Sequence, residues 1–91
     1  MRQDTIQDLQ AFNEQIFDII QEYVENKDCY PKSPALIINT SSLKLCIDGL
    51  EDNPSCDIYP LSELTRIDDD GNIEPDADAT FDIASKYIFV R

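Results

Sequence analysis

The stretch that decides the fold runs from Thr5 to Asn26 and reads TIQDLQAFNEQIFDIIQEYVEN. Its apolar side chains recur at steps of three and four residues, whereas Gln, Glu and Asp occupy the opposite side. The apolar set consists of Ile6, Leu9, Phe12, Ile16, Ile20 and Tyr23, widened by Phe17, Ile19 and Val24. This spacing predicts an amphipathic helix over about residues 5–26. Thr5 or Asp4 is its expected N-cap, and Asp8 is placed for a capping box.

Two strand patterns follow the helix. Residues 35–39 form a short apolar, β-branched run, which is typical of a strand buried on both faces. Residues 43–48 alternate apolar with polar side chains, which places Lys44 and Asp48 away from the core. The short polar link 40–42 predicts a hairpin over about residues 35–48. We therefore expect a single α+β domain over residues 1–91, with a long N-terminal amphipathic helix packed on a small, mainly antiparallel sheet.

The C-terminal half is less regular. Residues 49–78 are expected to form an acidic loop region, in which residues 57–59 could add an edge strand that Pro60 ends. Residues 61–66 fit either a helical turn or a strand. Residues 69–72, Asp-Asp-Gly-Asn, predict a tight turn.

The chain is expected to end in a short helix over about residues 78–87, with Asp76 or Asp78 as its N-cap. The apolar run 87–90 favours a strand instead, so the whole segment 78–91 could be helical or extended. The preferred interpretation is a helix followed by extended residues able to pair with the sheet.

Charge is the most distinctive chemical feature. Residues 48–82 hold twelve carboxylates and one cation, Arg66, in a chain whose formal net charge is −12. The acids are densest at 68–78, and the candidate partner-binding set is Asp68, Asp69, Asp70, Glu74, Asp76 and Asp78. Such a surface could attract a basic protein partner, and inhibitors that mimic DNA are one subclass of that idea. The alternative is that these acids serve only solubility.

The same charge argues against other partners. The seven basic residues are scattered, so direct binding to nucleic acid or to an anionic membrane surface is not expected. No apolar run approaches the length of a membrane span, and no signal peptide follows Met1, so we expect a cytoplasmic protein.

A second candidate site is a calcium loop centred on Gly71. If Gly71 takes the sixth position of a twelve-residue loop, the ligands are Asp68, Asp70, Asn72 and Glu74. The ends of the pattern fail, because Arg66 and Ala77 stand where the first Asp and the bidentate Glu belong. Weak calcium or divalent-cation binding is therefore an alternative to a solvated acidic turn, and no other cofactor is expected.

The sequence does not favour catalysis. It contains no histidine, and its three cysteines, Cys29, Cys46 and Cys56, are odd in number and lack a CxxC pair. The expected function is that of a small cytosolic interaction or regulatory protein without enzymatic activity. A further alternative is a structural subunit or a homodimer that uses the N-terminal helix face. For the oligomeric state, the sequence leaves both a monomer and a homodimer open.

Overall fold

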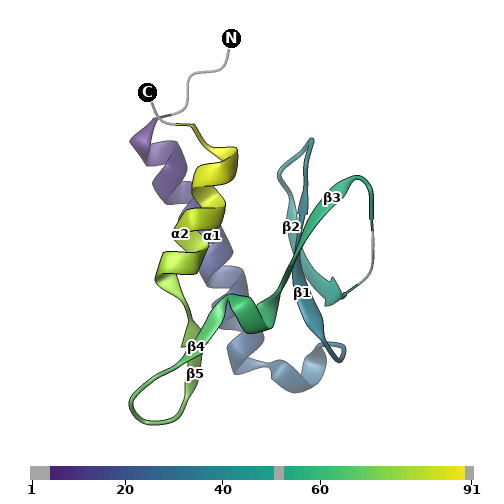
Figure 1. Ribbon diagram of the computed structural model, residues 1–91, viewed down its shortest axis with the longest axis vertical. Helices are drawn as coiled ribbons and strands as arrows, with labels where there is room; N and C mark the ends of the chain where they lie inside the picture. The colour runs from purple at the N-terminus through teal and green to yellow at the C-terminus, as the bar shows by residue number, and fades with distance from the viewer. Residues whose placement is uncertain (1–4, 51–52, 90–91) are drawn as a thin grey trace.

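A computed structural model describes residues 5–50 and 53–89. It confirms the α+β fold, with two helices on one side and a three-stranded sheet on the other (Figure 1). A small second hairpin projects from the end of the molecule opposite the two termini (Figure 1). The elements in chain order are α1 (Ile6–Glu25), η1 (Lys27–Cys29), β1 (Pro34–Asn39), β2 (Leu45–Gly49), β3 (Cys56–Pro60), η2 (Leu61–Glu63), β4 (Thr65–Ile67), β5 (Ile73–Pro75) and α2 (Ala77–Tyr87).

Helix α1 begins with the predicted capping box. The Thr5 hydroxyl accepts a hydrogen bond from the Asp8 amide at 3.1 Å, and the Asp8 carboxylate accepts from the Thr5 amide at 2.8 Å. These two bonds satisfy backbone donors that have no partner within the helix. The other expected cap, Asp4, lies outside the described residues.

The three-stranded sheet has the order β2-β1-β3, and both pairings are antiparallel. Strand β1 lies in the centre because its apolar run can be buried on both faces, and Ala35, Leu36 and Ile38 are buried. Lys44 and Asp48 are exposed, as predicted for the β1–β2 hairpin. The third strand is also confirmed as an edge strand that ends at Pro60.

The expectation that residues 49–78 form an acidic loop region is wrong for much of that range, which has regular secondary structure. This segment contains β3, the 3-10 turn η2 and an antiparallel hairpin, β4–β5. The undecided residues 61–66 therefore form a helical turn followed by the start of a strand. Strands of three residues are too short to show an alternating pattern.

Helix α2 begins one residue earlier than predicted, with Asp76 rather than Asp78 as its N-cap. The Asp76 carboxylate accepts from the amides of Asp78 and Ala79 at 3.1 and 3.3 Å. Ile88 and Phe89 continue beyond the helix without joining a strand among the described residues. The apolar run that favoured a strand is explained by packing, because Ile88 is buried in the core.

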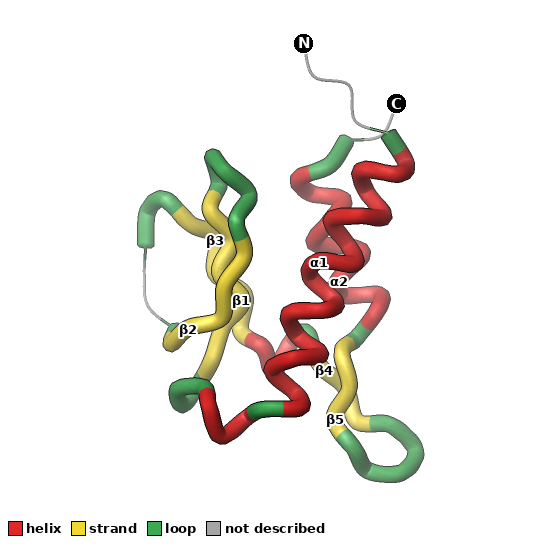
Figure 2. The backbone as a smooth tube through the Cα atoms, turned by 180° about the vertical axis from the view of Figure 1, so that it is seen from behind, coloured by secondary structure: helices red, strands yellow, loops and turns green. Residues whose placement is uncertain are grey.

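The core lies between the helices and the inner face of the sheet, where α1 runs alongside α2 (Figure 2). The apolar face of α1 supplies four buried side chains, and Ile16 and Ile20 have no exposed surface. The buried core consists of Leu9, Phe12, Ile16, Ile20, Leu36, Ile38, Leu61, Leu64, Ile83, Ala84 and Ile88. The helix face considered for a homodimer is thus used largely within the single chain.

Candidate functional site

The six acids proposed for partner binding lie on the β4–β5 hairpin and the first turn of α2. Asp68 organises the hairpin turn, because its Oδ1 accepts from the amides of Asp70 and Asn72 at 2.9 and 2.8 Å. Gly71 adopts a φ of +84°, a backbone conformation that residues with a Cβ rarely adopt. The predicted turn at 69–72 is confirmed, and the Asp68 side chain is part of its structure.

Glu74 is paired with the one cation of the acidic segment. Arg66 and Glu74 are directly opposite each other in the hairpin, and Arg66 Nε donates to Glu74 Oε1 at 2.6 Å. This hydrogen bond, together with the charge of Glu74, raises the pKa of Arg66 further above its usual value. The pair neutralises Arg66 and fixes the two short strands relative to each other.

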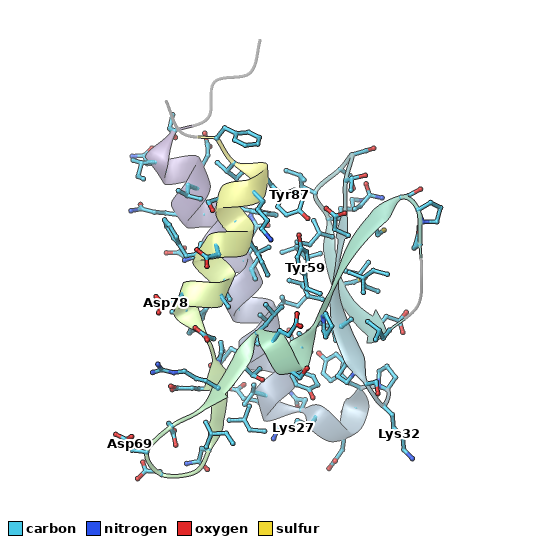
Figure 3. All side chains as sticks on the ribbon, viewed as in Figure 1. Lys27, Lys32, Tyr59, Asp69, Asp78 and Tyr87 are labelled. Carbon is cyan, nitrogen blue, oxygen red and sulfur yellow. The ribbon has the colours of Figure 1, made fainter. Side chains whose placement is uncertain are left out.

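Asp69, Asp70 and Asp78 differ from the other three acids. All three residues are exposed, and their carboxylates accept no hydrogen bond within residues 5–50 and 53–89. Asp69 and Asp78 both point outward on the side of the molecule away from the three-stranded sheet (Figure 3). We call Asp69, Asp70 and Asp78 the acidic edge.

A shallow depression of about 290 Å³ lies beside the acidic edge, where the hairpin meets α2. Phe17 of α1 supplies apolar surface to it, and Arg66, Glu74, Asp76 and Asp78 supply charged groups. The structure thus brings three of the predicted site residues, Glu74, Asp76 and Asp78, and the cation Arg66 around one half-buried aromatic ring.

The calcium interpretation has a geometric difficulty. Two of its four ligands are engaged, since Asp68 holds the turn amides and Glu74 holds Arg66. Among the described residues no three Asp, Glu, Cys or His side chains are grouped so that they could hold a metal ion. Binding a cation here would require Glu74 to leave Arg66.

The fold leaves all three cysteines as free thiols. Cys29 and Cys46 are exposed, Cys56 is half-buried, and none of the three is in a disulfide. Partial burial raises the pKa of the Cys46 thiol, and the nearby Asp48 and Cys56 raise it further. A thiol with a raised pKa carries less thiolate at neutral pH and is a weaker nucleophile.

Two features were missed in the sequence. A pocket of about 450 Å³ at the end of the sheet is lined by Tyr23, Ser33, Pro34, Leu50, Pro60, Leu61, Ser62, Thr65 and Ile73. These residues come from most of the chain, and no local motif could have revealed them. A groove between α1 and β2 is lined by Asp18 and Glu22. A sequence pattern could have indicated this acidic helix face, because Glu14, Asp18 and Glu22 recur every four residues.

No protein-family model, no curated protein and no solved structure matches this chain. Of the helices in the described ranges, none is both long enough and apolar enough to cross a bilayer.

Proposed function

We propose that this protein is a small binding protein without catalytic activity, and that its acidic edge contacts a basic protein partner. The carrying observation is that Asp69, Asp70 and Asp78 are exposed, with carboxylates that accept no hydrogen bond from described residues, while Arg66 is already paired with Glu74. Of these three acids, Arg66 interacts only with Asp78, so the charges of Asp69 and Asp70 are not offset by the cation of the same hairpin. A local excess of negative charge steers a basic surface toward the site.

The engaged acids support this proposal by holding the acidic edge in place. Asp68 ties the turn that carries Asp69 and Asp70, and Asp76 ties the first turn of α2 beside Asp78. Charges presented on an ordered backbone lose less conformational entropy when they bind. The apolar surface of Phe17 could also cover the aliphatic stem of a lysine or arginine from the partner.

The competing explanation is that the acids serve only solubility. The two explanations differ in what salt and charge removal do. An exposed ion pair contributes roughly 0.2–1 kcal/mol and is screened by salt, so a functional acidic edge predicts binding that weakens in salt. Acids that serve only solubility predict no change in what the protein binds.

The experiment compares two variants that lose the same charge. Asp69→Asn/Asp70→Asn alters the hairpin tip, and Asp28→Asn/Glu63→Gln removes two exposed acids elsewhere. Each protein is used to capture partners from extracts of its source cell at low and high salt. The hairpin variant should lose the salt-sensitive partners that the wild type and the control retain. Recovery of the same partners by all three proteins contradicts the proposal.

A further inference from the structure

The outer edge of β2 has backbone groups that no described residue pairs with. Asn39 donates to the Lys44 carbonyl at 3.0 Å, and Leu50 donates to the Ser33 carbonyl at 3.2 Å. Given the β1–β2 register and the alternation of an antiparallel ladder, the backbone groups of Leu45 and Ile47 point away from β1. No other described residue bonds to these N–H and C=O groups. They form an open edge onto which another strand could pair.

The opposite edge of the sheet, strand β3, is less open to pairing with another strand. In β3 the outward-pointing residues are Cys56, Ile58 and Pro60, by the same alternation. Pro60 has no N–H, and the Cys56 amide donates to the Asn53 carbonyl at 3.1 Å. Proline and local bonds of this kind are common protections of edge strands. Because neither Pro60 nor Cys56 offers a free N–H, β2 is the more open of the two edges.

A groove runs between the β2 edge and α1. It measures about 650 Å³ and is lined by Gln15, Asp18, Ile19 and Glu22 of α1 and by residues 42–45. Figure 2 shows α1 beside β2, and the two elements are in contact. Leu45 and Ile47 turn their partly buried side chains toward the core, on the face that α1 covers. A strand added at this edge would direct alternate side chains toward the acids of α1.

The acids of α1 are unfavourable for the helix itself. Glu14, Asp18 and Glu22 stand four residues apart, and like charges at this spacing destabilise a helix. Glu22 and Glu25 lie near the C-terminal end, where the helix dipole disfavours anions, and α1 contains no lysine or arginine. The Asp18 and Glu22 carboxylates make no ion pair within the described part of the chain. A cationic ligand would relieve this repulsion.

We propose that β2 accepts an extended, basic segment of another protein as a fourth, antiparallel strand. Leu45 and Ile47 supply the backbone bonds, while Asp18 and Glu22 receive lysine or arginine side chains at alternate positions of the segment. The spacings agree, because four residues of helix rise about 6 Å and two residues of strand span about 6.8 Å. A second copy of this chain is a poor occupant, since two chains of net charge −12 would meet acid to acid. The proposal uses none of the acidic-edge residues and stands independently of the function proposed for them.

The probe is a peptide of about eight residues in which valine alternates with lysine. In an antiparallel pair, directly opposite residues share a face, and every second pair exchanges both backbone hydrogen bonds. The outward groups of Leu45 and Ile47 place the residues opposite them in such hydrogen-bonded pairs. The lysines facing α1 must therefore also supply the N–H groups that meet Leu45 and Ile47. Methylating the lysine amide nitrogens should abolish binding, and methylating the valine amide nitrogens, the matched control, should preserve it. Binding is followed by amide chemical shifts and hydrogen exchange on the full chain.

We expect the peptide to protect the amides of Leu45 and Ile47 from exchange. Asp18→Asn/Glu22→Gln should weaken binding about three- to tenfold, whereas Asp69→Asn/Asp70→Asn should leave it unchanged. Equal binding of both methylated peptides would overturn the proposal, as would unprotected Leu45 and Ile47 amides at about 1 mM peptide. It is also overturned if sedimentation shows a homodimer in which these amides are protected without peptide.

Discussion

Replacing Tyr87 by phenylalanine removes one hydroxyl that ties α2 to the sheet. This hydroxyl donates to the Asp57 carboxylate, and it lies 2.8 Å from the hydroxyl of Tyr59. Since the single proton of Tyr87 is given to Asp57, Tyr59 must donate to the Tyr87 oxygen. Tyr87→Phe therefore removes two hydrogen bonds between α2 and β3 at once, while the edge contact between the rings of residues 12 and 87 can persist.

We expect this substitution to lower the free energy of unfolding by about 1–2 kcal/mol. A hydrogen bond contributes about 0.5–1.5 kcal/mol net, and bonds to charged acceptors are stronger, but Asp57 is exposed and regains water in the variant. For a domain of this size the change corresponds to a fall in Tm of roughly 5–10 °C.

Urea denaturation followed by circular dichroism measures this change. Tyr30→Phe is the control, because it removes the same atom from a ring that contacts Tyr23 and whose hydroxyl makes no bond with a described residue. The control should stay within about 0.5 kcal/mol of the wild type. The reasoning is refuted if the two variants are equally stable.

The same cluster predicts a pH dependence. Burial, with the hydrogen bonds to Asp57 and Tyr59, raises the pKa of Tyr87 well above its usual value of about 10. Above about pH 10 the Tyr87 hydroxyl loses its proton in the unfolded chain but keeps it in the folded chain. The unfolded state then binds fewer protons, so stability falls as pH rises. Below pH 10 the contribution is fully present. Denaturation between about pH 9 and 11 should show a steeper loss for the wild type than for Tyr87→Phe.

Three further predictions concern the second half of the chain. Asp76→Ala removes the N-cap of α2 and should cost about 1 kcal/mol by urea denaturation, whereas Asp78→Asn, which removes no cap, should cost far less. Gly71→Ala places a residue with a Cβ at a φ of +84° and should lower stability by about 1 kcal/mol. If the hairpin opens locally, amide exchange should become faster in the hairpin and stay unchanged in the rest of the described chain. Millimolar calcium should leave the amide signals of Gly71 and Asn72 unshifted in an NMR titration, because Asp68 and Glu74 are engaged; saturable shifts there would contradict this.

The elements with long, regular patterns could be predicted from the sequence. Residues 5–26 repeat their apolar positions over several turns, and the β1–β2 hairpin follows from one apolar and one alternating run. In both cases the local pattern agrees with the burial that the tertiary structure imposes. The acid at the start of α2 was also recognisable as a cap, because Asp is a favoured N-cap residue and Asp76 precedes the helix formers Ala77 and Ala79.

The β4–β5 hairpin and the roles of individual acids could not be predicted. Strands β4 and β5 are three residues long, and their pairing places Arg66 opposite Glu74, eight residues away in the sequence. Asp68 looks identical to Asp69 in sequence, yet only the fold shows that Asp68 holds the turn. The Tyr87–Asp57 contact joins residues thirty positions apart, and no spacing rule anticipates it.

The most direct test of the proposed acidic edge is the salt dependence of partner binding. The dissociation constant of a basic partner captured by the wild type is measured by calorimetry over a range of salt, for the wild type and for Asp69→Asn/Asp70→Asn/Asp78→Asn. The variant should bind more weakly at low salt, with a shallower salt dependence, and the two curves should converge at high salt as screening removes the difference. Curves that coincide at every salt concentration would contradict the claim that Asp69, Asp70 and Asp78 form the binding surface.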